Sequence, residues 1–165
     1  MKQWQLTRFG AENLELTDAA IPQPGPHELL VRVSAVSLTY RDKMDIEGSY
    51  FSNFTMPLVP FSDAVGEVVA TGADVTRFQT GQRVLTHFFP NWLDGQVRPE
   101  SASLCLGSPL PGVLSEYILI DENGAVVAPA YLSDEEASTL PIAALTAWWA
   151  LFANKPLLPG QTVLV

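Results

Sequence analysis

The stretch PFSDAVGEVVATGADVTRFQTGQRV, residues 60–84, decides the fold class of this chain. Its segment DAVGEVVATG predicts a β-strand, and Gly66 inside that strand indicates either close approach by a neighbouring backbone or a bulge. A turn at Thr80 and Gly81 then leads into TGQRVLT, which predicts a second short strand. Short strands separated by turns are typical of a β-barrel or a β-sandwich.

The same alternation continues on both sides of this stretch. Residues 2–8 alternate polar and apolar side chains, and the alternation resumes at Leu14 and Leu16 after the turn FGAEN, which predicts a hairpin. The segments ELLVRVSAVS (28–37) and LSEYILI (114–120) also have a period of two. The sequence therefore predicts a mainly β fold.

The character of the sequence changes near residue 130, where LSDEEASTLPIAALTAWWALFAN predicts helices. Ser133 and Glu136 have the spacing of a capping box, and acidic residues suit the positive end of a helix. Pro141 predicts the start of a second helical segment, because proline fits the first turn of a helix.

The C-terminal part of the chain is unusually apolar. Within residues 142–153 only Thr146 is polar, and a helix that is apolar on every side must be covered on every side. The run QTVLV (161–165) reads as the beginning of a buried parallel strand, which needs partners on both sides. We therefore expect a second domain, most of which is absent from this chain.

Charge and cysteine content narrow the possible partners and the compartment. The 165 residues include 9 Lys and Arg against 18 Asp and Glu, and a net charge of −9 argues against a nucleic acid or an anionic membrane as partner. The single cysteine, Cys105, excludes an internal disulfide and fits a reducing cytoplasm. We see no signal peptide and no membrane-spanning stretch, so we expect a cytoplasmic protein.

The order and spacing of five motifs resemble the medium-chain dehydrogenase/reductase family, which includes zinc alcohol dehydrogenases and quinone oxidoreductases. The resemblance implies a GroES-like substrate domain over residues 1–125. It also implies that residues 126–165 are linker helices and the first strand of an incomplete, doubly wound nucleotide-binding domain. In the family, a glycine-rich turn for the cofactor pyrophosphate follows that strand. The motifs are GPHELLVRVSAVSLTYRD, PFSDAVGEVVATGADVTRFQTGQRV, GVLSEYILI, LSDEEASTLPIAALTAW and LLPGQTVLV.

The resemblance implies an oxidoreductase that uses NADP or NAD to transfer hydride to or from a small carbonyl, enone or quinone-like substrate. Because most of the cofactor domain is expected to be absent, we expect this chain alone to be inactive and to bind NAD(P)H weakly. The alternative is a stand-alone GroES-like binding or assembly module without catalysis. Exposed apolar surface also makes a homodimer possible.

The resemblance further implies that no zinc is bound. Zinc-dependent members place a cysteine where this chain has Thr39, and a His-Glu pair where it has Ser62 and Asp63. The four-cysteine lobe that holds a structural zinc in many relatives is also absent, since only Cys105 is present there. Hydride transfer then depends on positioning and on hydrogen-bond donors, which suits enones and quinones because conjugation spreads the developing charge.

The motif TYRD supplies four candidate residues. The Thr39 hydroxyl either hydrogen-bonds substrate or nicotinamide, or its methyl group simply packs at a strand end. Arg41 and Asp42 either shape the cleft floor as a pair or form an exposed ion pair of small energy. Alternatively, Arg41 approaches the cofactor phosphates, which arginine binds in a bidentate manner. Tyr40 occupies a slot where many relatives have a basic residue near the pyrophosphate.

Three further polar residues are candidates by position. Ser62 and Asp63 are expected at the substrate pocket, where Asp63 acts either as a proton relay or as a hydrogen-bonded anchor for backbone. Thr146 is expected near the nicotinamide carboxamide, and the alternative is a hydroxyl bonded back to its own helix.

Aromatic residues in two loops are candidates for the roof of a hydrophobic pocket. If they line it, the substrate is apolar or aromatic; the alternative is a small satellite core under a long loop. These residues are Phe88, Phe89 and Trp92 in one loop, and Tyr50, Phe51 and Phe54 in the other.

Overall fold

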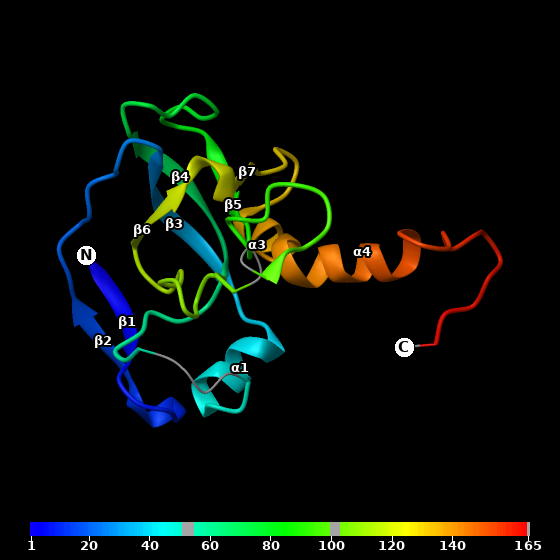
Figure 1. Ribbon diagram of the computed structural model, residues 1–165, viewed down its shortest axis with the longest axis horizontal. Helices are drawn as coiled ribbons and strands as arrows, with labels where there is room; N and C mark the ends of the chain where they lie inside the picture. The colour runs from blue at the N-terminus through cyan, green and yellow to red at the C-terminus, as the bar shows by residue number, and fades with distance from the viewer. Residues whose placement is uncertain (51–54, 100–102, 165) are drawn as a thin grey trace.

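The computed structural model describes residues 1–50, 55–99 and 103–164. Five antiparallel strands in the order β6-β3-β4-β5-β7 form a curled sheet, and a two-stranded hairpin lies beside it (Figure 1). The mainly β class and the N-terminal hairpin are confirmed. The strands are β1 Lys2–Leu6, β2 Leu14–Asp18, β3 Glu28–Ser37, β4 Asp63–Thr71, β5 Arg83–Thr86, β6 Tyr117–Asp121 and β7 Ala125–Val127.

Strand β7 was not predicted from the sequence. It has only three residues, and Val126 and Val127 are both exposed, so the segment carries no inward-outward pattern. Its pairing with β5 extends the sheet to Val127, two residues beyond the expected domain boundary at residue 125.

Gly66 marks the tightest contact between β3 and β4. A Cβ atom at this position would lie 2.3 Å from the carbonyl oxygen of Arg32, so only glycine allows the two backbones to approach this closely. The pairing register of β3 against β4 shifts between Val33 and Ala35, next to the Gly66–Val33 pair. The structure therefore confirms both readings of Gly66, close approach and a local irregularity.

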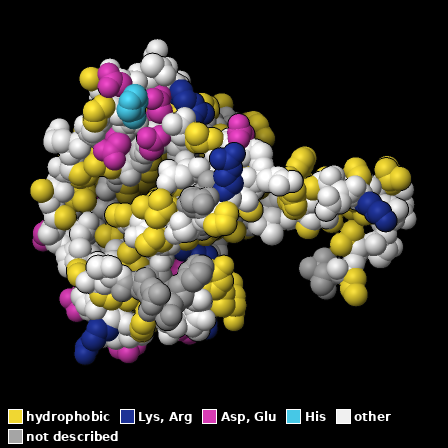
Figure 2. Space-filling view, in the orientation of Figure 1, with side chains coloured by type: hydrophobic (Ala, Val, Ile, Leu, Met, Phe, Trp, Pro, Cys, Tyr) yellow, Lys and Arg dark blue, Asp and Glu magenta, His cyan; other side chains and the backbone are white. Residues whose placement is uncertain are grey.

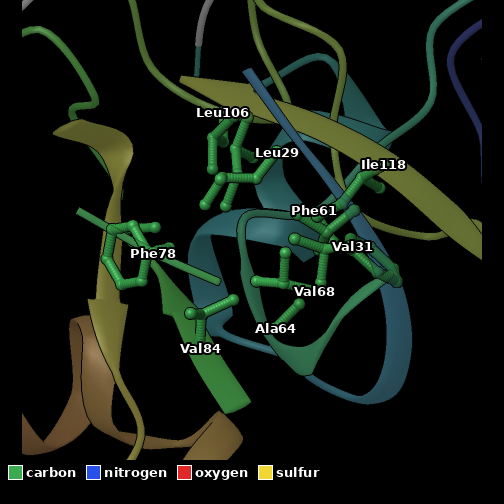
Figure 3. Packing of buried hydrophobic residues seen from close by; sticks show 12 residues of the cluster. Leu29, Val31, Phe61, Ala64, Val68, Phe78, Val84, Leu106 and Ile118 are labelled. Atoms are coloured by element: carbon green, nitrogen blue, oxygen red, sulfur yellow. The ribbon is translucent and has the colours of Figure 1, made fainter. Parts of the chain in front are cut away.

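Apolar side chains fill the inside of the curled sheet (Figure 3). They come from the inward faces of the strands and from the loops that close the ends of the barrel, as the period of two predicts. The buried cluster comprises Leu29, Val31, Phe61, Ala64, Val68, Phe78, Val84, Leu106, Val113, Ile118, Ile120 and Ala125.

A short helix, α1 (Tyr40–Glu47), follows β3 and was not predicted from the sequence. It ends at Gly48, whose φ of 72° is the left-handed conformation that glycine adopts readily. Its buried residues are charged, namely Arg41, Asp42 and Asp45, so no apolar stripe marked it as a helix. Two 3-10 turns, η1 Ala11–Asn13 and η2 Glu122–Gly124, complete the connections of the barrel.

The C-terminal part is helical, as expected, in three consecutive pieces. Ser133 and Glu136 form the predicted capping box, with Glu136 N donating to Ser133 Oγ at 3.2 Å and Ser133 N donating to Glu136 Oε2 at 3.0 Å. The segment that starts near Pro141 is confirmed as helical, first as a π-helix and then as an α-helix. The pieces are α3 Asp134–Ser138, η3 Leu140–Ala144 and α4 Leu145–Phe152.

Helix α4 projects away from the barrel (Figure 1), and apolar side chains lie along the projecting segment (Figure 2). Leu145, Trp148 and Trp149 are 52%, 55% and 62% exposed. The cover that the sequence requires for this helix is therefore not provided by the barrel. Residues 161–164 form no strand here, and their assignment to the first strand of a second domain stays a prediction. In the described ranges, no helix is long and apolar enough to cross a membrane.

Candidate functional site

Three candidate residues from the sequence, Thr39, Ser62 and Asp63, are linked to one buried arginine, Arg41, directly or through Asp42 and Ser62. Thr39 ends the extended segment after β3, whereas Ser62 and Asp63 lie at the start of β4. The Arg41 guanidinium reaches from α1 to Ser62, with Nη1 donating to Ser62 Oγ at 3.4 Å. Strand β4 and helix α1 thus bring together residues that are more than twenty positions apart in the chain.

The hydroxyl of Thr39 is already used as a donor. It donates to Asp42 Oδ2 at 3.0 Å, and the backbone N–H of Thr39 donates to the same oxygen at 2.7 Å. Burial raises the pKa of Asp42, although both hydrogen bonds from Thr39 act to lower it. In this arrangement Thr39 offers its oxygen lone pairs, not its proton, to a bound molecule.

Arg41 is a buried structural centre, so the interpretation of an exposed ion pair with Asp42 is wrong. Its Nη2 lies 2.9 Å from Asp45 Oδ2 and donates to the carbonyl of Leu106 at 3.2 Å. Its guanidinium carbon lies 4.6 Å from the centre of the Phe88 ring. The pair with Asp42 is real but longer, at 3.7 Å, and the two side chains are only 10% and 1% exposed.

Asp63 is fully buried, and both of its carboxylate oxygens accept hydrogen bonds. Ser62 Oγ donates to Oδ1 at 2.9 Å, and the backbone N–H of Ile142 in η3 donates to Oδ2 at 3.0 Å. Burial raises its pKa to about 6, against the lowering effect of these two hydrogen bonds. Asp63 thus anchors backbone of the C-terminal helical segment, while its role as a proton relay stays a prediction.

The cluster keeps some polar atoms without a hydrogen-bond partner in the described part of the chain. They are Nε of Arg41 and one carboxylate oxygen, Oδ1, on each of Asp42 and Asp45. Burial also raises the pKa of Asp45, and the charge of Arg41 opposes that rise. One guanidinium thus lies among three buried carboxyl groups whose charged forms are all disfavoured by burial.

The exposed candidates lie outside this cluster. Tyr40, at the first position of α1, is 73% exposed, and Tyr50 is 47% exposed. Thr146 on α4 is also exposed, and its hydroxyl makes no hydrogen bond within the described ranges, so it is not bonded back to its own helix. Their roles toward cofactor or substrate stay predictions.

The aromatic loop after β5 packs on itself and on the cluster. Phe88 and Phe89 meet edge to face with ring centres 4.3 Å apart, and the ring centres of Phe89 and Trp92 are 6.3 Å apart. Trp92 is 36% exposed and donates from Nε1 to the carbonyl of Gly95 at 3.2 Å. Phe88 covers Arg41, whereas Phe89 and Trp92 form the outer part of the loop. Phe51 and Phe54 lie outside the described residues.

A cavity of about 220 Å³ lies elsewhere, between β6 and the N-terminal hairpin. Its lining is mainly apolar and includes Met1, Pro22, Val113 and Leu119. Since none of the predicted site residues lines it, the sequence-based candidates do not converge on this cavity.

Asp45 and Phe88 are contacts of Arg41 that the sequence did not assign to the cluster. The signal for Asp45 was its spacing of four residues from Arg41, which places the two side chains on one face of a helix once α1 is recognised. No pattern in the sequence indicated that the Leu106 carbonyl would accept from the same guanidinium, because the two residues are 65 positions apart.

Nothing in the described residues gathers three or more His, Cys, Asp or Glu side chains as a potential metal site. Cys105, the one thiol, is 4% exposed and donates to the carbonyl of Ser108 at 2.6 Å. Burial raises the pKa of this thiol, which disfavours the thiolate that a metal requires.

Comparison with known proteins identifies this fold. Residues 25–130 match the alcohol dehydrogenase GroES-like domain. A zinc-type alcohol dehydrogenase-like protein of Schizosaccharomyces pombe is 38% identical over 159 residues, which cover 94% of this chain and 46% of the relative. A chloroplastic quinone-oxidoreductase homolog of Spinacia oleracea is 33% identical over 149 residues, covering 88% of this chain and 40% of that protein.

Solved structures agree with the sequence comparison. A putative alcohol dehydrogenase from Sinorhizobium meliloti superposes with a TM-score of 0.85 at 43% identity, over 92% of this chain and 46% of that one. A quinone oxidoreductase from Coxiella burnetii superposes with a TM-score of 0.73 at 28% identity, over 92% and 44% of the two chains. This chain thus spans less than half the length of each of these relatives. It belongs to the medium-chain dehydrogenase/reductase family, and residues 25–130 are its alcohol dehydrogenase GroES-like domain.

Proposed function

We propose that the whole protein is an NAD(P)-dependent oxidoreductase that works without zinc and reduces a small apolar or aromatic enone, quinone or carbonyl compound. This chain supplies the substrate side of the site. The proposal draws on relatives named alcohol dehydrogenase and quinone oxidoreductase. One structure among them is described as an NAD-dependent alcohol dehydrogenase.

The zinc-free part of the proposal rests on the chemistry of Thr39, Ser62 and Asp63, the residues at the three positions where the resemblance implies zinc ligands. Zinc takes thiolate, imidazole or carboxylate ligands. Here two of the positions are hydroxyls, and the one carboxylate, Asp63, already accepts hydrogen bonds at both oxygens. The Arg41 guanidinium, 3.4 Å from Ser62 Oγ, adds a positive charge where a cation would have to sit. These residues do not fit a zinc ion.

Without a metal, the chain's own residues position the substrate. Thr39 presents hydroxyl lone pairs, because its proton is directed to Asp42. Such an acceptor suits an N–H or O–H group of a bound molecule, for example a carboxamide. It does not suit a developing oxyanion, which requires donors. A conjugated substrate reduces the need for such donors, which is why we favour enones and quinones.

The cofactor is NADP or NAD, and when bound it supplies or accepts the hydride. We place Tyr40 and Thr146 on the cofactor side, since both are exposed. Tyr40 is next to Arg41 in the chain, and Thr146 lies four residues after Ile142, whose amide binds Asp63. The phosphate-binding turn of the family is not among these residues, so we expect weak cofactor binding and no turnover by this chain alone.

The aromatic loop limits the substrate to apolar or aromatic molecules. Phe89 and Trp92 extend outward from the Phe88 ring that covers Arg41, and Tyr50, three residues after the end of α1, is 47% exposed. Aromatic faces of this kind favour planar, conjugated rings. We also propose that the protein is cytoplasmic, binds neither nucleic acid nor membrane, and associates, if at all, as a homodimer.

The test is a turnover assay on the whole protein after treatment with a metal chelator. We expect the protein to oxidise NADPH or NADH when a quinone or an enone is present, as measured by the loss of nicotinamide absorbance. Added zinc should not increase this rate. Oxidation of a simple alcohol that depends on added zinc would contradict the proposal. The absence of NADPH and NADH oxidation with a quinone, an enone and a simple carbonyl compound would also contradict it.

A further inference from the structure

One hydrogen bond connects the buried cluster to the C-terminal helical segment. Oδ2 of Asp63, at the start of β4, accepts from the backbone N–H of Ile142 at 3.0 Å, although the two residues are 79 positions apart. Ile142 lies in the first turn of the segment formed by η3 and α4. A carboxylate at the start of a helix is favoured there, because the free N–H groups carry partial positive charge.

The residues before Pro141 make further contacts with the barrel, and η3 itself lies against β4. Ala137 and Leu140 pack against the outer face of the sheet. Arg83 of β5 binds Asp134 with Nη2 at 2.6 Å from Oδ1. In the part of the chain that the structure describes, Ile142 makes the last hydrogen bond to the barrel before α4 extends into solvent. The direction of α4 is therefore determined near Asp63.

Asp63 is itself fixed by the cluster under Thr39. Ser62 Oγ donates to Oδ1 of Asp63 at 2.9 Å, and Arg41 donates to Ser62 at 3.4 Å. Arg41 is in turn bound by Asp45 at 2.9 Å. With one oxygen bound to the cluster and the other to Ile142, the Asp63 carboxylate has a single orientation, and it transmits the position of the cluster to the helix.

We propose that Asp63 is a positioning residue that fixes the direction of α4 and thereby places Thr146 relative to Thr39. The part that concerns Thr146 and Thr39 rests on the proposed function, since it assigns them to the cofactor and substrate sides. The part that concerns the helix stands on the hydrogen bond alone.

The first experiment measures hydrogen exchange of the Ile142 amide in this chain by NMR. We expect Asp63→Ala to increase the exchange rate of this amide about tenfold, because a buried hydrogen bond to a charged acceptor is lost. Asp63→Asn keeps one acceptor oxygen and should restore part of the protection. Glu67→Ala, on the same strand in an exposed pair with Arg32, is the matched control and should leave the rate unchanged.

Amides of the barrel strands report whether each variant is folded. An unchanged exchange rate of the Ile142 amide in Asp63→Ala would overturn the proposal. Equal losses of amide protection in Asp63→Ala and Asp63→Asn would also overturn it. If Asp63→Ala does not fold, Asp63→Asn is compared with the wild-type chain instead. Exchange rates identical to wild type at every amide of η3 and α4 would then overturn the proposal.

The second experiment uses the whole protein and separates KM from kcat. We expect Asp63→Ala to raise KM for the nicotinamide cofactor about tenfold while kcat changes less, since the helix is displaced but the reacting groups are retained. An unchanged cofactor KM in an active protein would overturn the placement of Thr146. If the wild-type protein has no activity, the proposed function fails, and the exchange experiment still decides the role of Asp63 toward the helix.

Discussion

The burial of Asp63 predicts how the stability of the chain depends on pH. Burial raises its pKa to about 6 from a usual value of 3.8, so between these values the folded chain holds a proton that the unfolded chain has lost. The free energy of unfolding therefore falls as pH rises from about 4 to about 6 and is constant above that range. For this group alone the fall is on the order of 3 kcal/mol.

Substitution by a neutral isostere should remove this fall. Urea unfolding at pH 4 and at pH 6 gives the fall in the free energy of unfolding between these pH values. We expect this fall to be about 3 kcal/mol smaller in Asp63→Asn than in wild type. Asp42 and Asp45 also have raised pKa values, so some dependence of the same sign should remain. Glu67→Gln, an exposed carboxylate on β4, should behave like wild type. Equal pH dependence in Asp63→Asn and wild type would contradict the assignment.

At the scale of secondary-structure elements, the contact of β3 with β4 depends on Gly66. A Cβ atom there would lie 2.3 Å from a backbone oxygen of Arg32, so Gly66→Ala must separate the two central strands. We expect a loss of about 3 kcal/mol in thermal or urea unfolding. Gly81→Ala is the control, because its Cβ meets nothing within 4 Å and only its φ of +90° is strained, at about 1 kcal/mol. Equal losses of stability in Gly66→Ala and Gly81→Ala would show that the close approach of the backbones at Gly66 does not determine the stability of this strand pair.

Arg83 connects the sheet to helix α3. Its guanidinium binds Asp134 at 2.6 Å and donates to the carbonyl of Leu132 at 3.2 Å. Because both charged side chains are about a third exposed, solvent weakens the pair, and we expect Arg83→Leu to cost about 1 to 2 kcal/mol. Arg32→Leu, in a more exposed pair, should cost less than about 1 kcal/mol in the same unfolding assay. A smaller cost for Arg83 than for Arg32 would contradict this ranking.

Alternation and turn residues predicted the barrel strands and the N-terminal hairpin, because an inward face must be apolar when the other face is not. The same rule could not find α1, whose buried face consists of Arg41, Asp42 and Asp45. A helix that buries charge has no apolar period. Strand β7 was not predicted for a different reason. It has three residues, two of which are exposed valines, and this is too short for an alternating pattern.

The candidate site was predictable in part. The residues TYRD and Ser62–Asp63 were located from motif order, and the structure brings Thr39, Arg41 and Asp63 into one cluster. The partner of Asp63 was not predictable, because a hydrogen bond to Ile142 across 79 residues depends on where the helical segment crosses the barrel. No local sequence pattern contains that information.

In the whole molecule, the barrel and the C-terminal helix differ in how they meet the requirement for burial. The barrel encloses its own apolar cluster, with Leu29, Val68 and Val113 at 0% exposure. Helix α4 has the composition of a buried element but exposes Trp148 and Trp149 at its surface. The cluster around Arg41 is linked to the C-terminal helical segment by the hydrogen bond between Asp63 and Ile142.

The most direct test of the account is the zinc content of the protein. The protein is incubated with zinc, desalted, and analysed by mass spectrometry for metal per chain. We predict well below one zinc per chain, because the Asp63 oxygens and the Arg41 charge leave no place for the ion. One tightly bound zinc per chain, lost on Asp63→Asn, would contradict the central claim that this site works without a metal.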